Sequence, residues 1–131
     1  MANIPDDLKY AKTHEWLRLE GDVATLGITD FAQGELSDIV YVEITAVGKT
    51  IKRDEPIGTI EAVKAVSDLY SPVSGQVITA NDSLKDSPAN VNKDPYGEGW
   101  MAKIKVSDPT ELAGLLDATA YAELAGRSAH H

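Results

Sequence analysis

Hydrophobic and polar residues alternate along several short segments of this chain, a pattern that is typical of half-buried β-strands. The clearest segments are residues 16–19, 23–28, 39–44, 75–80 and 99–106. Gly21 and Asp22 form a turn signal between the first two segments. Many short strands separated by turns predict a small, flattened β-barrel or sandwich, so we expect a fold that is mainly β.

Short helices interrupt or follow this pattern. Thr29 and Asp30 are both good N-caps, and they predict one or two helical turns over residues 29–36. Residues 84–96 contain two prolines and few apolar side chains, so they predict a loop.

The C-terminal part of the chain predicts two further helices. Asp108, Pro109 and Glu111 have the spacing of an N-cap, a first helical position and a capping box. An apolar stripe is expected to follow at Leu112, Leu115 and Leu116. A second short helix is predicted over residues 118–125 and is expected to end at Gly126.

Composition narrows the class of protein. A chain of 131 residues suits one domain. Its net charge of −9 argues against binding to nucleic acid or to anionic membranes. It contains no cysteine and no apolar run long enough to span a membrane. We assign residues 1–125 to a single domain and interpret residues 126–131, which end in two histidines, as the remnant of an expression tag.

Lys64 stands out because short apolar, alternating runs lie on both sides of it. The turn residues Ser71 and Pro72 lie farther along the chain, so Lys64 is expected at the exposed tip of a tight hairpin. A lysine there offers a long flexible stem and an amine that is nucleophilic once deprotonated. By position alone, the plainer interpretation is that it is one of nine lysines that serve solubility, since most exposed lysines have no specific role.

The residues around Lys64 resemble the modification site of lipoyl-bearing carrier domains, and most closely that of the glycine cleavage H-protein family. The family motif reads Glu-x-Val-Lys-(Ala/Ser)-x-Ser-Asp and continues to Ser-Pro-(Val/Ile)-Ser-Gly. It matches here at Glu61, Val63, Lys64, Ala65, Ser67, Asp68 and residues 71–75. Three more segments resemble the family in the same order: an opening strand at 8–16, a helix entry at 27–33 and a second hairpin at 91–101.

The resemblance implies a barrel-sandwich hybrid of the lipoyl and biotinyl carrier type, with short helices that include a C-terminal helical segment. It implies that Lys64 carries lipoic acid as an amide and that the protein shuttles the aminomethyl group of glycine. The implied partners are glycine decarboxylase, which is a pyridoxal-phosphate enzyme, aminomethyltransferase, dihydrolipoyl dehydrogenase, and a lipoate ligase or lipoyltransferase. A bacterial, cytoplasmic location is expected.

The same resemblance implies roles for individual residues. Glu61, Val63, Ala65 and Gly75 are expected to shape the hairpin or to be recognised by the ligase. Thr13, Glu15 and Asp68 match polar positions of a cleft that shelters the loaded arm, where a carboxylate would pair with an ammonium group. The plainer interpretations are a strand-edge charge for Glu15, a β-forming residue at Thr13 and a solvated hairpin face at Asp68. For Glu61 the alternative is a pair with a lysine on a neighbouring strand.

A catalytic role of its own is not expected. Outside the histidines at the C-terminus, His14 is the only histidine, and no nucleophile elbow, metal-ligand spacing or phosphate-binding glycine loop accompanies it. Two other functions remain open on this basis. One is a lipoyl donor that relays the cofactor to other enzymes, and the other is an unmodified interaction module.

Overall fold

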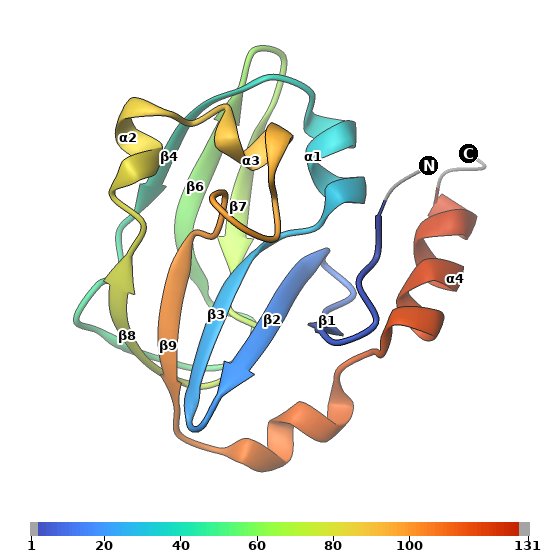
Figure 1. Cartoon of the computed structure of the whole chain (residues 1–131). Helices are drawn as coiled ribbons and strands as arrows, with labels where there is room; N and C mark the ends of the chain where they lie inside the picture. The colour runs from blue at the N-terminus through green and yellow to red at the C-terminus, as the bar shows by residue number, and fades with distance from the viewer. Residues whose placement is uncertain (1–2, 129–131) are drawn as a thin grey trace.

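The computed structural model describes residues 3–128 and is mainly β (Figure 1). Its strands form two antiparallel sheets. The larger sheet contains, in spatial order, β1 (Lys9–Tyr10), β2 (Glu15–Glu20), β3 (Val23–Ile28), β9 (Ala102–Val106), β8 (Gly75–Ala80) and β5 (Thr50–Ile51). The smaller sheet contains β4 (Ile39–Ile44), β6 (Pro56–Ala62) and β7 (Val66–Tyr70).

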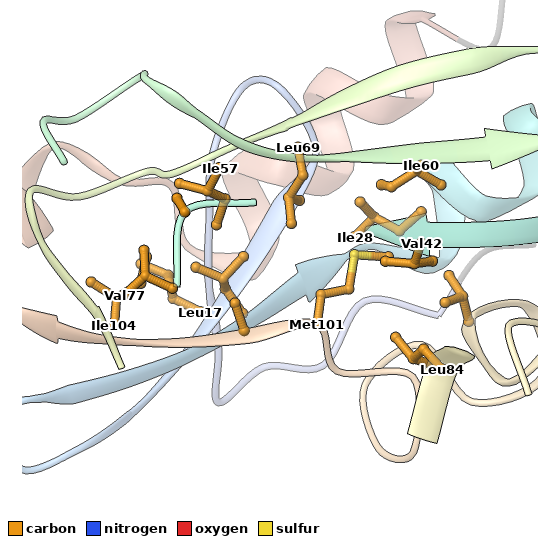
Figure 2. Close-up of a cluster of buried hydrophobic side chains, with 14 of the residues drawn as sticks. Leu17, Ile28, Val42, Ile57, Ile60, Leu69, Val77, Leu84, Met101 and Ile104 are labelled. Carbon is orange, nitrogen blue, oxygen red and sulfur yellow. The ribbon is translucent and has the colours of Figure 1, made fainter. Parts of the chain in front are cut away.

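The main hydrophobic core fills the space between the two sheets (Figure 2). Leu17 and Ile104 come from the larger sheet, and Ile60 and Leu69 come from the smaller one. Each of these side chains is almost completely buried. Burial of one such side chain stabilises the fold by roughly 1.5–3 kcal/mol relative to exposure, so the alternation that predicts the strands also holds the sheets together.

Helix α1 (Asp30–Leu36) begins as the sequence predicts. Thr29 is the N-cap, and its hydroxyl accepts a hydrogen bond from the backbone N–H of Ala32 at 3.2 Å. The helix ends at Ser37, whose φ of 67° lies in the left-handed region that few residues other than glycine adopt. This sharp exit turns the chain directly into β4.

The prediction of a loop over residues 84–96 is wrong, and so is the prediction of a hairpin over 91–101. Two one-turn helices lie there, α2 (Ser83–Asp86) and α3 (Asn90–Lys93). Leu84 and Val91 are the one buried residue of each helix, and both pack into the main core. A single apolar side chain per turn produces no periodic pattern, which is why sequence reasoning missed these helices.

The predicted helix after Asp108 is a 3₁₀-helix, η1 (Pro109–Gly114). Asp108 caps it by accepting a hydrogen bond from the backbone N–H of Thr110. The predicted capping box does not form, because the Glu111 carboxylate instead accepts hydrogen bonds from the backbone N–H and the hydroxyl of Ser74 at 2.7 and 2.9 Å. Glu111 therefore ties this segment to the start of β8.

The predicted leucine stripe is divided between two clusters. Leu112 and Leu115 pack against the main core, whereas Leu116 packs against a second cluster. Tyr10 and Trp16 belong to this second cluster. A 3₁₀-helix followed by an extended residue at Leu115 does not keep the 3.6-residue period that a single stripe requires.

Helix α4 (Ala118–Ser128) ends the described chain and lies on the side of β1 (Figure 1). Its residues Ala118, Tyr121 and Ala125 belong to the second cluster. It continues past Gly126, so the predicted end at that residue is wrong. Gly126 has no positive φ and no neighbour within 4 Å, so nothing there forces the chain out of the helix. The residues we interpret as a tag therefore begin inside α4, and the last three of them, 129–131, lie outside the described residues.

Candidate functional site

Lys64 lies in the three-residue connection between β6 and β7, at the exposed tip of a hairpin. The backbone N–H of Ala62 donates to the carbonyl of Ala65 at 2.7 Å, which closes the tip. The backbone N–H of Val63 donates to the carbonyl of Asp38 at 3.0 Å, which ties the tip to the chain just before β4. The placement of Lys64 at an exposed tip agrees with the sequence prediction.

The residues that flank Lys64 present an apolar and acidic surface. Val63 is 73% exposed and Val66 is 67% exposed, although both are hydrophobic. Glu61 stands opposite Tyr41 on β4 and opposite Val66 on β7, so these three side chains share the outer face of the smaller sheet. Ala65 is half-buried beside the lysine.

Gly75 does not lie in this hairpin. It is the first residue of β8, where it pairs with Val106 of β9 and with Ile51 of β5. A Cβ atom at this position would stand 2.1 Å from the carbonyl oxygen of Lys105. The structure thus explains Gly75 by close backbone approach within the larger sheet.

A cleft of about 340 Å³ opens between β7 and α1. It brings together the three residues that the sequence predicted for an arm cleft, Thr13, Glu15 and Asp68. They come from the turn before β2, from the first residue of β2 and from the middle of β7. The other lining residues, which sequence reasoning did not predict for this site, are His14, Ile28, Phe31, Ala32, Glu35, Leu36 and Ser67.

Glu15 is the most unusual group of the cleft, because its carboxylate side chain is only 2% exposed. Burial raises the pKa of Glu15 to about 7, since desolvation disfavours the charged form. Hydrogen bonds from the Thr13 hydroxyl and from the backbone of Tyr70 lower this pKa and so limit the rise. A carboxyl group with such a pKa changes its charge near neutral pH, and a cation in the cleft would favour its ionised form.

Asp68 occupies a different environment. Its side chain is exposed, and its carboxylate accepts a hydrogen bond from the Tyr70 hydroxyl at 3.4 Å. Asp68 lies opposite Thr59 on β6, which in turn lies opposite Glu43 on β4. Asp68 therefore lines the rim of the cleft and also belongs to the outer face of the smaller sheet.

His14 forms part of the cleft wall through contacts that join distant parts of the chain. Its Nδ1 lies 2.7 Å from the hydroxyl of Tyr121 in α4, and that hydroxyl lies 2.7 Å from the hydroxyl of Thr29. Burial lowers the pKa of His14. Its ring centroid lies 5.1 Å from that of Phe31, which also lines the cleft.

Within residues 3–128, no group of three or more histidine, aspartate or glutamate side chains is arranged to hold a metal ion. None of the helices in the described part of the chain is both long enough and apolar enough to cross a membrane.

Comparison with known proteins identifies relatives over nearly the whole chain. Residues 8–127 match the model of the glycine cleavage H-protein family. A glycine cleavage system H protein from Symbiobacterium thermophilum is 54% identical over 121 residues, which cover 92% of this chain and 94% of the relative. Another from Rubrobacter xylanophilus is 60% identical over 112 residues, covering 86% and 89%.

The fold agrees with this assignment. The crystal structure of a glycine cleavage system H protein from Mycobacterium marinum superposes with a TM-score of 0.85. It is 37% identical in sequence, and the match covers 94% of this chain and 99% of that one. The predicted fold class, a mainly β carrier fold with short helices and a C-terminal helix, is thereby confirmed. This chain belongs to the glycine cleavage H-protein family, the carrier component of the glycine cleavage system.

Proposed function

We propose that the side-chain amine of Lys64 is joined to lipoic acid as an amide. The support is the exposed position of Lys64 at a tight hairpin tip within a chain of this family. When bound, lipoic acid supplies a disulfide that accepts an aminomethyl group and electrons. Lys64 contributes the long stem, and the hairpin holds the base of that stem away from the body of the protein.

The cleft beside β7 is the proposed shelter for the loaded arm, whose end carries a primary amine. Glu15 would hold the ammonium form of that amine through a charge-assisted hydrogen bond. The Thr13 hydroxyl, already bonded to Glu15, keeps the carboxylate oriented. The apolar walls from Ile28, Phe31 and Leu36 would exclude water from the reactive carbon.

The proposed partners are glycine decarboxylase, aminomethyltransferase, dihydrolipoyl dehydrogenase, and the lipoate ligase or lipoyltransferase that modifies Lys64. We propose that this chain positions the arm and that the partners supply the catalytic groups. The net charge of −9 and the carboxylates of Glu43, Glu61 and Asp68 on one sheet face favour encounter with basic partner surfaces. Tethering raises the effective concentration of the arm at each partner.

The decisive experiment is an intact-mass measurement on protein from cells supplied with lipoate, followed by peptide mapping. We expect one lipoyl increment on Lys64 and none on the other lysines. Lys64→Arg, which keeps the charge and the length of the side chain, is the matched control and should show no increment. An unmodified Lys64 in the presence of an active ligase would contradict the proposal and favour an unmodified interaction module.

A further inference from the structure

The side-chain amide of Asn92, in α3, makes three hydrogen bonds to the junction between α1 and β4. Its Oδ1 accepts from the backbone N–H of Ile39 at 3.0 Å. Its Nδ2 donates to the carbonyl of Ser37 at 2.8 Å and to Oε1 of Gln33 at 2.9 Å. The oxygen must face Ile39 and the nitrogen must face Ser37, because a backbone N–H only donates and a carbonyl only accepts.

This junction needs external support. Ser37 has a φ of 67°, which costs conformational energy in a residue with a Cβ. β4 is also an edge strand, since β6 is its one neighbour in the sheet. The Asn92 amide satisfies the carbonyl of Ser37 and the N–H of Ile39, as a neighbouring strand would. The amide therefore takes the place of a neighbouring strand at the exposed edge where β4 begins.

Asp38, which lies between Ser37 and Ile39, binds the lysine hairpin through its backbone carbonyl. The carbonyl of Asp38 accepts the 3.0 Å hydrogen bond from the backbone N–H of Val63, the residue immediately before Lys64. The side chain of Val63 is 73% exposed, so packing contributes little to fixing the tip. The hydrogen bond from Ala62 to Ala65 is internal to the hairpin. The tip is therefore fixed to the body by the Val63 bond and by the pairing of Ala62 with Ile39 on β4, and both contacts start from the segment that Asn92 supports.

The third hydrogen bond of Asn92 extends the connection to the cleft. Gln33 belongs to α1, and the same helix contributes Phe31 and Leu36 to the cleft wall. α1 and α3 lie next to each other in Figure 1, on the side of the molecule that bears the β6–β7 hairpin. The Asn92 amide thus connects α1, which forms one wall of the cleft, to the segment before β4 that binds the hairpin.

We propose that Asn92 is a positioning residue for Lys64, acting through Ser37, Asp38 and Val63 to fix the lysine hairpin relative to α1. This inference rests on the proposed lipoylation of Lys64. A hairpin without this support would spend less time in the geometry that a ligase binds. The Michaelis constant for the acceptor protein would then rise in proportion, while the turnover of bound protein would stay the same.

The test compares Asn92→Ala with Asn81→Ala. Asn81 is a matched control, because it is also half-buried and its Nδ2 donates to two backbone carbonyls, those of Glu98 and Trp100, at 2.9 and 2.8 Å. Lipoylation by a lipoate ligase is measured with full-length acceptor protein, well below the melting temperature. For Asn92→Ala we expect the KM for the acceptor to rise about five-fold with an unchanged kcat. This corresponds to a fall to about one fifth in the fraction of protein whose hairpin has the geometry that the ligase binds.

Hydrogen exchange at the Val63 amide provides a second readout that does not depend on the ligase. We expect Asn92→Ala to speed this exchange about ten-fold, and Asn81→Ala to leave it unchanged. Asn92→Asp, which keeps the acceptor for Ile39 but loses both donors, should shift both readouts in the same direction and serves if the alanine variant does not fold.

The outcomes separate this inference from the proposed function. A wild-type protein that is not lipoylated contradicts the proposed function, whereas faster Val63 exchange in Asn92→Ala alone would still support the positioning role. Unchanged KM and unchanged exchange in Asn92→Ala would overturn the inference. Equal effects of Asn81→Ala would overturn it as well, because they would indicate general destabilisation.

Discussion

The hydroxyl of Tyr121 lies 2.7 Å from Nδ1 of His14, although 107 residues separate the two in the chain. The same hydroxyl lies 2.7 Å from the N-cap residue Thr29, and the ring of Tyr121 stacks on Tyr10 with 4.7 Å between centroids. One side chain of α4 therefore connects the cleft wall, the start of α1 and the second hydrophobic cluster. Burial raises the pKa of Tyr121, so the hydroxyl stays protonated at neutral pH.

We expect Tyr121→Phe to lower the free energy of unfolding by about 1–3 kcal/mol, since the ring remains stacked but buried polar atoms of His14 and Thr29 lose a partner. Thermal or urea denaturation measures this change. Tyr41→Phe is the control, because Tyr41 is exposed and its hydroxyl bonds to the exposed Glu43 at 3.3 Å. Equal stability of Tyr121→Phe and the wild type would show that the hydroxyl does not hold α4.

The sequence predicts local elements of this fold but not the contact between His14 and Tyr121. Alternation at residues 23–28 and 39–44 predicts β3 and β4 with the correct bounds, and the capping preference of Thr29 predicts the start of α1. Both signals are local. The contact between His14 and Tyr121 depends on how α4 packs against the sheet, which no local pattern records.

The cleft likewise contains some residues that the sequence predicts and others that it does not. Thr13, Glu15 and Asp68 were predicted through resemblance to a family, and the structure brings them to one cavity. His14 and Phe31 lie in segments that resemble the family, but they were missed as cleft residues because both reach the site only through tertiary packing. The burial of Glu15 could not be predicted from the sequence either, since a glutamate at the start of a strand is usually exposed.

The raised pKa of Glu15 predicts a dependence of stability on pH. The ordinary value is 4.5 and the value in the fold is about 7, so the folded state binds the proton more tightly than the unfolded state does. The contribution of Glu15 to stability is therefore fully present below pH 4.5 and is lost as the pH rises through about 7.

We expect Glu15→Gln to abolish this dependence, because the neutral amide has a similar shape and does not ionise. The free energy of unfolding of Glu15→Gln, minus that of the wild type, should therefore be about 3 kcal/mol larger at pH 8 than at pH 4. This figure follows from the pKa shift at 1.36 kcal/mol per pKa unit. Urea denaturation at several pH values measures this difference. A wild type and Glu15→Gln with parallel pH profiles would contradict the raised pKa.

Glu15 is also expected to prolong the lifetime of the loaded arm, if the cleft shelters it as proposed. Loss of a charge-assisted hydrogen bond worth about 1.5–3 kcal/mol predicts release of the bound amine at least about ten-fold faster in lipoylated Glu15→Ala. The measurement is the rate of ammonia release from the isolated, loaded protein. Asp68→Ala should have a smaller effect because Asp68 is exposed. Lipoylation should be intact in both, and an unchanged lifetime in Glu15→Ala would remove the sheltering role.

Glu61 is expected to act in recognition by the ligase and not in folding. It is half-buried on the outer face of the smaller sheet, beside the exposed Tyr41 and Val66, and its cross-strand neighbours include no lysine. Glu61→Ala should slow lipoylation of Lys64 several-fold and change the free energy of unfolding by less than about 0.5 kcal/mol. Glu43→Ala, farther from the hairpin tip on the same face, removes the same charge and should slow lipoylation less than Glu61→Ala does. Lipoylation of Glu61→Ala at the wild-type rate would assign this carboxylate to the solvated surface only.

Gly75 is expected to matter for the sheet. In Gly75→Ala, the new Cβ would stand 2.1 Å from the carbonyl oxygen of Lys105 and 2.9 Å from Cγ2 of Ile104, so β8 and β9 would have to move apart. Such overpacking predicts a loss of about 1–3 kcal/mol in the free energy of unfolding. Gly34→Ala in α1 is the matched control: its Cβ meets nothing within 4 Å, and it should stabilise the protein by about 0.5–1 kcal/mol. Folded Gly75→Ala should still be lipoylated at Lys64, because Gly75 lies outside the hairpin. Normal stability with impaired lipoylation would instead assign Gly75 to ligase recognition.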